Sequence, residues 1–226
     1  MRSVSRGTGS RSWTRSSRRI RAIGRCPTLS LRPERFTAGA RVADIGCGSG
    51  HALAVMGAAC PASTFVGYDI SEDSIERGRA EVCEAGLSNV TFEVADVAEL
   101  EPEQPFDAVF AFDAIHDQAK PAAVLRAAHD ALVPGGTFFM MDLALSSKLE
   151  DNIGNPQARW TYSSSTLYCM TVSLAEGGAG LGGAWGWQTA KRMLAEAGFG
   201  EVVTHRPAPG SERNMIYVTH RPSFAD

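Results

Sequence analysis

The sequence predicts a doubly wound α/β fold with a mostly parallel sheet. Short apolar segments typical of buried strands alternate with helical patterns from about residue 36 onward. This alternation implies right-handed crossovers and a sheet covered by helices on both faces. Near the C-terminus, strand-like segments 202–205 and 215–219 are separated by a turn too short for a helix. These two segments are expected to form an antiparallel hairpin.

The helix expected after Ser71 has the clearest local signals. Ser71 offers an N-cap, and the acidic residues that follow it occupy the favourable first turn. This helix is expected to bury Ile75, Val82 and Cys83 and to end at Gly86. The parallel strands are expected at 41–46, 64–69, 90–94, 106–112 and 137–141, and the other helices at 51–60, 121–132 and 189–197.

The composition describes one globular domain with an acidic body. The chain has 226 residues, of which 44% are hydrophobic and 21% charged, as in ordinary soluble domains. Residues 1–35 contain ten Arg and one acidic residue, a net charge of +9 that leaves −12 for the rest of a chain of net charge −3. We therefore expect no nucleic-acid partner, because backbone contacts depend on Lys and Arg. No apolar run approaches the roughly 20 residues of a membrane span, so no membrane partner is expected either.

Residues 1–34 are expected to be an Arg- and Ser-rich segment ahead of a domain over 35–226. The segment shows no hydrophobic period and cannot bury enough apolar surface to offset its ordering entropy. Three interpretations stay open: a disordered tail, a mistaken start ahead of the true domain, and a mitochondrial transit peptide. The last rests on a composition rich in Arg and Ser and poor in acidic residues.

The cysteines and histidines indicate neither disulfides nor a metal centre. The five cysteines are scattered, odd in number and form no C-x-x-C pair. This favours a reducing compartment, and we expect a cytoplasmic protein with a mitochondrial location as the alternative. No two of the five histidines have metal-ligand spacing on a helix, so no protein-bound metal ion is expected.

A glycine-rich turn, D-I-G-C-G-S-G at 44–50, joins the first strand to the first helix. Glycines permit a tight turn and close approach of a ligand, and the helix N-terminus adds unpaired N–H groups. Alone, such a turn could be a plain strand-to-helix connection. Its G-x-G-x-G spacing differs from that of dinucleotide sites, and Asp44 would repel a pyrophosphate. The turn therefore favours a ligand with a cationic or amine group over a nicotinamide cofactor.

Carboxylates also mark the ends of the next two strands. Asp69 ends the second strand, where it can accept hydrogen bonds from both hydroxyls of a ribose, and Asp96 follows the third, within reach of an adenine amino group. Parallel strands end at one edge of a sheet, so Asp44, Asp69 and Asp96 are expected to lie along the same ligand edge.

These motifs together resemble the class I S-adenosylmethionine (SAM)-dependent methyltransferases. The segments VADIGCGSG, FVGYDIS, VTFEVADV, PFDAVFAFDAIHD and LVPGGTFFMMD have the order and spacing of that family, over roughly residues 36–220. The resemblance implies a seven-stranded Rossmann-like sheet whose last strand is antiparallel, with SAM as cofactor. It further implies that the cofactor-binding residues are Asp44, Gly46, Gly48, Gly50, Asp69, Ile70, Asp96, Val97, Phe112 and Asp113.

A closer similarity is to methyltransferases whose catalytic domain follows an N-terminal winged-helix dimerisation domain. The sequences F-D-A-I-H-D at 112–117, L-E-D-N-x-x-N-P at 149–156 and S-T-L-x-C at 165–169 carry this similarity. Residues 1–30 resemble no winged helix, so the dimerisation domain is expected to be missing. The resemblance implies a homodimer, which this difference leaves open.

His116 is the candidate catalytic base, four residues past Phe112 at the exit of the fourth strand. Methyl transfer from a sulfonium mainly requires alignment and exclusion of water, with a base only where the nucleophile carries a proton. The alternative is a loop histidine bonded to the backbone near the cofactor. Asp117 is disfavoured as its orienting partner, because adjacent side chains seldom face one another.

Residues 144–187 form an insertion too long for an ordinary strand-to-helix connection. We expect an aromatic lid over a substrate pocket, or a helix whose packing replaces a lost domain interface. Arg159 and Tyr162 are candidate substrate contacts, Arg159 being otherwise a structural ion-pair residue. The glycine-rich stretch 177–183 is expected to be a hinge or a loose connector. The aromatic residues of the insertion are Trp160, Tyr162, Tyr168, Trp185 and Trp187.

Two hypotheses about function follow. The first is an enzyme that transfers a methyl group from SAM to oxygen, nitrogen or carbon of a small organic acceptor. The second is a SAM-binding regulatory or structural protein without turnover, since intact cofactor carboxylates alone do not require catalysis.

Overall fold

The computed structural model describes residues 36, 38–206 and 213–223. The three interpretations of residues 1–34 and the turn of the C-terminal hairpin concern segments outside the described residues.

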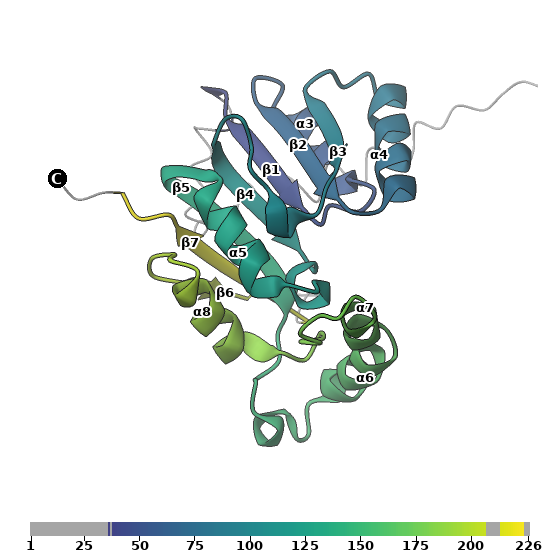
Figure 1. The fold of residues 1–226 in the computed structure, drawn as a ribbon, viewed down its shortest axis with the longest axis vertical. Coiled ribbons are helices and arrows are strands. Elements are labelled where there is room, and N and C mark those ends of the chain that lie inside the picture. The colour runs from purple at the N-terminus through teal and green to yellow at the C-terminus, as the bar shows by residue number, and fades with distance from the viewer. Residues whose placement is uncertain (1–35, 37, 207–212, 224–226) are drawn as a thin grey trace, which may run out of the picture.

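The described residues form one seven-stranded sheet of order β3-β2-β1-β4-β5-β7-β6 (Figure 1). Strands β1 to β5 are mutually parallel, whereas β7 runs antiparallel to both β5 and β6. The predicted doubly wound fold with its antiparallel C-terminal hairpin is therefore confirmed. The strands are β1 (Arg41–Ile45), β2 (Thr64–Asp69), β3 (Val90–Val94), β4 (Phe106–Phe112), β5 (Leu132–Leu143), β6 (Val203–His205) and β7 (Asn214–His220).

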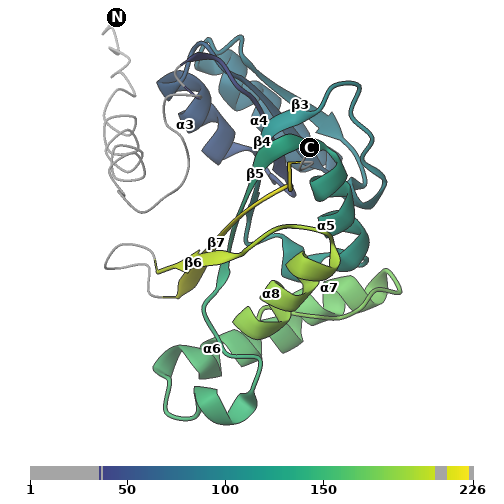
Figure 2. The ribbon, with the colours of Figure 1, turned by 90° about the vertical axis from the view of Figure 1, so that its left-hand side faces the viewer.

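Helices cover both faces of the sheet, as the alternation of elements predicted (Figures 1 and 2). One face packs against α3 (His51–Ala59) and α4 (Glu72–Glu84). The other packs against α5 (Pro121–Asp130) and α8 (Gly186–Glu196). In β1, Val42 belongs to the first core and Ala43 and Ile45 to the second, because successive strand residues point to opposite faces.

Helix α4 confirms its predicted start but not its whole predicted face. The Ser71 hydroxyl accepts a hydrogen bond from the Ser74 N–H at 3.3 Å, as expected of an N-cap. Ile75 and Val82 are buried, whereas Cys83 is exposed, so its predicted burial is wrong. Residues three, four and seven apart share a helix face, and the third buried position of this face is Gly78.

Strand β5 is longer than predicted, because the Pro134-Gly135-Gly136 segment lies within it. Phe106 pairs with Leu132 and Ala108 with Thr137, so the pairing with β4 shifts across this segment. Such an irregularity accommodates a proline, which has no N–H to give to the ladder.

The insertion between β5 and α8 is largely helical. A 3₁₀ turn, η3 (Leu149–Asn152), precedes α6 (Pro156–Ser164), a π-helical turn η4 (Ser165–Cys169) and α7 (Met170–Ala175). The last three form a run over 156–175, here called the insertion helix, at one end of the molecule (Figures 1 and 2). Within the described ranges, no helix has the length and apolar character needed to cross a membrane.

Candidate functional site

The glycine turn lies at the edge where β1 to β5 end, here called the carboxyl edge. Gly46, Gly48 and Gly50 have φ values of 65°, 55° and 66°, in the left-handed region that favours glycine. A Cβ on Gly46 would lie 2.7 Å from Ala114 Cβ, and one on Gly50 would overlap the Phe92 ring. A Cβ on Gly48 would meet nothing within 4 Å. Gly46 and Gly50 therefore permit close packing, while Gly48 borders open space that a ligand can fill.

Asp44 is a buried carboxylate beside this turn. Its Oδ1 atom has no hydrogen-bond partner among the described residues. Burial, followed by the negative charge of Asp69, raises the pKa of Asp44 well above its usual value. A buried, unpartnered carboxylate is costly, and a cationic ligand group would supply the missing partner. The arrangement fits the ammonium group of the expected cofactor.

Asp69 is held by backbone hydrogen bonds at the end of β2. Its Oδ2 accepts from the Gly48 N–H at 2.7 Å, and its Oδ1 from the Ser71 N–H at 2.9 Å. Each oxygen retains a further lone pair for ligand hydroxyls. Ile70, the next residue, is 75% exposed, which is unusual for a large apolar side chain and fits stacking on a flat group.

At the end of the third strand, Asp96 is exposed whereas Val97 is buried. Asp96 is exposed, and its Oδ1 accepts from the Ala98 N–H at 2.9 Å, capping the 3₁₀ turn η1 (Val97–Glu99). The Val97 side chain is buried in the core beneath this turn. Only the backbone of Val97 is therefore available for the role that the resemblance implied.

At the end of β4, Phe112 is half-buried and Asp113 adopts a strained backbone. The Phe112 ring stacks on Phe110 with centroids 5.7 Å apart. Asp113 has φ of 50°, the only positive value at a non-glycine among the described residues. Its Oδ1 accepts from Asn214 Nδ2 of β7 at 3.1 Å. Asn214 belongs to this edge only through the antiparallel pairing of β7 with β5.

His116 forms a buried ion pair that the sequence did not reveal. It lies in the turn η2 (Ile115–Asp117), and its Nδ1 is 2.8 Å from Oδ1 of Asp142, which is fully buried near the end of β5. Its Nε2 is 3.2 Å from Asp117 Oδ1. The 3₁₀ turn thus brings these two neighbouring side chains together, although no hydrogen bond joins them among the described residues. The ring contacts carboxylates rather than the backbone groups of the alternative interpretation.

The electrostatics of this cluster favour a charged imidazole. Burial alone lowers the pKa of His116. The interaction with Asp142, followed by the charges of Asp117 and Asp113, outweighs burial and raises the pKa to about 8. Buried groups whose pKa values are shifted by specific charge partners are typical of functional sites.

Cys169 also lies beside His116 and Asp117. One ligand atom from each of the three residues lies within 4.8 Å of the others, close enough for one ion. Burial, followed by a hydrogen bond and the charge of Asp117, raises the pKa of the Cys169 thiol to about 11. The thiol is therefore protonated at neutral pH, whereas the form that binds metal ions is the thiolate.

The glycine-rich segment of the insertion is pinned against the His116 loop. The Ala179 N–H donates to the Ala119 carbonyl at 2.9 Å, and the Gly182 N–H to the His116 carbonyl at 3.2 Å. A Cβ on Gly178 would overlap the Ala119 backbone. In place of the expected hinge or loose connector, these glycines allow two backbones to approach closely.

The insertion aromatics do not form the expected lid. Trp160 and Tyr168 are 62% and 64% exposed and point outward, and Trp185 is buried in the core. The Tyr162 hydroxyl accepts from Asn152 Nδ2 at 2.9 Å. Arg159 is exposed, and no hydrogen bond or ion pair joins it to another described residue. Neither candidate substrate contact is brought to the carboxyl edge by a described interaction.

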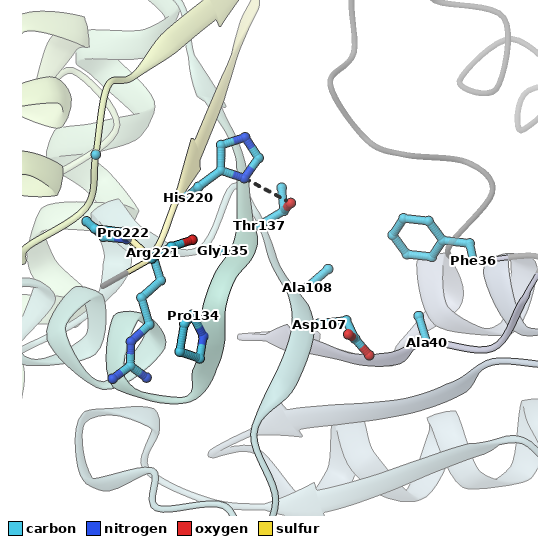
Figure 3. A pocket seen from close by; sticks show the side chains of 12 residues that line it. Phe36, Ala40, Asp107, Ala108, Pro134, Gly135, Thr137, His220, Arg221 and Pro222 are labelled. Atoms are coloured by element: carbon cyan, nitrogen blue, oxygen red, sulfur yellow. Dashed lines mark hydrogen bonds between the residues drawn. The ribbon is translucent and has the colours of Figure 1, made fainter. Parts of the chain in front are cut away.

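A separate cavity of about 440 Å³ lies at the opposite edge of the sheet (Figure 3). It is lined where β1 and β4 begin and β7 ends, by residues that include Ala40, Asp107 and Arg221. Thr137 Oγ1 contacts His220 Nδ1 there at 3.1 Å. This cavity shares no residue with the glycine turn or the His116 cluster.

Comparison with known proteins agrees with this geometry. A family model described as a methyltransferase domain matches residues 36–198. The chain is 34% identical over 124 residues to a trans-aconitate 2-methyltransferase of Methylobacterium nodulans, covering 55% of this chain and 43% of that protein. It is 36% identical over 110 residues to a ubiquinone biosynthesis O-methyltransferase of Xanthomonas campestris, covering 46% and 44%. The matched part thus spans less than half the length of these relatives.

Solved structures share the fold at low sequence identity. A Bacillus halodurans protein described as a candidate methyltransferase superposes with a TM-score of 0.62 and 17% identity, covering 82% of this chain and 94% of that one. The SAM-dependent methyltransferase SibL superposes with a TM-score of 0.61 and 21% identity, covering 96% and 60%. These likenesses show that the fold of this chain is shared with both solved structures.

Proposed function

We propose that this chain, which belongs to the class I SAM-dependent methyltransferases, methylates a small organic acceptor and that His116 removes a proton from it. The observation that carries the proposal is the buried His116–Asp142 pair at the same edge as the glycine turn. A buried histidine oriented by a carboxylate is suited to general base catalysis.

The residues of the first three strand ends fit SAM. Asp44 would pair with the ammonium group, Asp69 would accept from the ribose hydroxyls, and Ile70 and Asp96 would contact the adenine. When bound, SAM supplies an electrophilic methyl group. The open space at Gly48 and the unpartnered Oδ1 of Asp44 support this placement.

His116 acts at the Nε2 atom. Nδ1 lies 2.8 Å from Asp142, which leaves Nε2 as the nitrogen that accepts the proton of the acceptor. For this step the acceptor has to take the place of Asp117 Oδ1, which lies 3.2 Å from Nε2. The O–H or N–H bond of the acceptor breaks as its oxygen or nitrogen gains the methyl group, and the proton goes to Nε2. Asp142 stabilises the imidazolium that results. The role requires an acceptor with a removable proton, which a carboxylate at neutral pH does not have.

The charge around His116 restricts the acceptor further. Asp113, Asp117 and Asp142 all contribute negative charge to this cluster. A neutral or cationic acceptor is therefore favoured over an anionic one. Phe112 and Asp113 would line the path of the acceptor to the methyl group. Arg159 and Tyr162 stay secondary candidates for substrate contacts, since the acceptor would reach them only if the insertion helix shifts.

We also propose that the domain extends over residues 35–226 and works in a reducing compartment such as the cytoplasm. Four cysteines of the described part, Cys47, Cys60, Cys83 and Cys169, are free, as is usual where thiols stay reduced. The acidic body supports a small-molecule acceptor over a nucleic acid.

The test offers the purified chain SAM together with a panel of phenols, enols, amines and carboxylic acids. Formation of S-adenosylhomocysteine and of methylated product is followed by mass spectrometry, and SAM binding by calorimetry. We expect turnover with acceptors that carry an O–H or N–H group. Turnover confined to carboxylic acids would contradict the role of His116, and SAM binding without any turnover across the panel would contradict the activity.

A further inference from the structure

A hydrogen-bonded pair, Asp113 and Asn214, crosses the end of β5 at the carboxyl edge. Asn214 Nδ2 lies 3.1 Å from Oδ1 and 3.3 Å from Oδ2 of Asp113. The strand order places β5 between β4 and β7 (Figure 1), so pairing within the sheet does not itself join these two residues. Asn214 pairs with Leu143, the last residue of β5, and its side chain reaches across to the end of β4. The amide thereby fixes the position of both carboxylate oxygens.

The backbone at Asp113 does not require a carboxylate. Its φ of 50° lies in the left-handed region, where glycine is less strained than any residue with a side chain. The Asp113 N–H donates to the Met141 carbonyl at 2.8 Å, so the main chain itself holds the turn. The Asp113 side chain is therefore better explained by the site beside it than by the turn.

Asp113 is the most accessible of the three acidic residues whose charges act on His116. Asp142 is fully buried, and Asp117 has a buried Oδ1 atom 3.2 Å from the His116 Nε2. Asp113 is exposed, and its negative charge helps to raise the pKa of the buried His116. An acceptor whose reacting atom approaches His116 would thus have Asp113 beside it, on the solvent side.

The Asp113 carboxylate has room for a further hydrogen bond. Partial desolvation, followed by the charge of Asp142, raises the pKa of Asp113 to about 6, so the group is mostly ionised above pH 7. An ionised carboxylate only accepts hydrogen bonds, and each oxygen keeps a lone pair beyond the contact with Asn214. Arg213 lowers the pKa of Asp113, but no ion pair joins the two within the described ranges. A ligand group that donates a hydrogen bond is the partner this carboxylate suits.

We propose that the acceptor carries a second hydroxyl or amine near its reacting atom, that Asp113 accepts a hydrogen bond from this group, and that Asn214 positions Asp113 for the contact. The substrate class is then a diol, an amino alcohol or their aromatic counterparts. The inference rests on the proposed function, because the second donor is placed beside an atom that His116 deprotonates. Hydrogen bonds to charged groups are among the stronger ones, and for this exposed carboxylate we expect an effect of roughly tenfold on binding.

The experiment compares acceptors in pairs that differ by one donor group: phenol with catechol, and aniline with 2-aminophenol. The purified chain is assayed with SAM at about pH 9, above the pKa of His116, so that loss of the Asp113 charge does not change the amount of neutral base. We expect the wild type to favour the two-donor compound of a pair in kcat/KM. In Asp113→Asn and Asn214→Ala this preference should fall roughly tenfold, through KM rather than kcat.

Two further variants serve as controls. Asp73→Asn removes an exposed carboxylate in the first turn of α4, and it should keep the preference of the wild type. Asn214→Gln retains the amide donor and should lose less of the preference than Asn214→Ala. Differences in intrinsic reactivity between the compounds are the same for every variant, so they cancel in this comparison. Circular dichroism and urea unfolding report whether each variant folds.

Three outcomes would overturn the proposal. The first is equal kcat/KM for both members of each pair in the wild type, and the second is a preference that survives both Asp113→Asn and Asn214→Ala. The third is a loss of stability in Asn214→Ala with an unchanged preference, since the pair would then only link the ends of β4 and β7. Absence of turnover with every compound would contradict the proposed function itself, and this inference with it.

Discussion

The carboxyl edge holds its acidic side chains in two different ways. At the ends of β2 and β3, Asp69 and Asp96 accept hydrogen bonds from backbone N–H groups of adjacent turns. At the ends of β4 and β5, Asp142 is fully buried and contacts another side chain, His116. The first half is shaped mainly by backbone geometry, and its proposed function is to hold a cofactor. The second depends on charges within a buried pair, so its function responds to pH and to single substitutions.

The largest expected effect tests whether the second half performs the chemistry. His116→Gln removes the base but keeps a polar side chain of similar length, and we expect kcat to fall by roughly 10²–10⁴. SAM affinity should stay within about twofold of the wild type, because no cofactor carboxylate is changed. Steady-state kinetics and calorimetry measure the two quantities.

The matched control for this substitution is His129→Gln. His129 also contacts an acidic neighbour, with Nδ1 2.7 Å from Asp130 Oδ1, but it lies at the end of α5 away from the edge. Turnover should survive this change. Equal losses in the two variants would sink the assignment of His116 as the base.

The next largest effect is expected on stability, from a substitution in the glycine turn of the cofactor half. Gly50→Ala combines a positive φ with overlap on the Phe92 ring, and we expect a loss of about 3 kcal/mol in the free energy of unfolding. Gly86→Ala has the same φ of 66° but nothing within 4 Å of its Cβ, so it should lose only about 1 kcal/mol. Urea unfolding measures both, and equal losses would show that packing on Phe92 contributes nothing.

The difference between the halves also explains what could be predicted from the sequence. The glycine turn and Asp44 are contiguous, and Asp69 is brought to them because parallel strands must end at one edge. Strands β2, β3 and β4 have their predicted bounds for the same reason, since short apolar runs between turn residues are strong local signals.

Contacts between distant segments were not predictable in this way. Asp142 meets His116 only because β5 pairs with β4, and Asn214 reaches Asp113 from 101 residues away. The exposure of Trp160 and Tyr168 does not follow from the lid interpretation of residues 144–187, because the aromatic side chains of a lid are expected to face a pocket. The glycine segment packs closely on residues 116–119, so only small side chains fit between it and the insertion helix.

A smaller effect is expected on cofactor affinity. Asp69→Ala removes the acceptors proposed for the ribose hydroxyls and also frees the Gly48 and Ser71 N–H groups. We expect SAM to bind about 5–150-fold more weakly, equivalent to about 1–3 kcal/mol. Asp73→Ala, in the exposed first turn of α4, is the control. Unchanged affinity in Asp69→Ala would remove this residue from the cofactor site.

The pH dependence of kcat/KM should report the charge state of His116. His116 acts as a base only when neutral, and its pKa is about 8. Therefore kcat/KM should rise about tenfold per unit below pH 8 and level off above it. Because the folded-state pKa exceeds the unfolded value of about 6.5, protonation stabilises the fold by on the order of 2 kcal/mol at low pH. That stabilisation is lost as pH rises from about 6.5 through 8, so activity and stability should move in opposite directions.

Asp142→Asn tests the cause of this pKa. Removing the closest negative charge should lower the midpoint of the kcat/KM profile below 8, whereas Asp130→Asn beside His129 should leave it unchanged. An NMR titration of the His116 ring would report the same shift without turnover. A midpoint that stays at 8 in Asp142→Asn would mean that the buried pair does not control the base. The acceptor half would then be shaped by backbone geometry, as the cofactor half is.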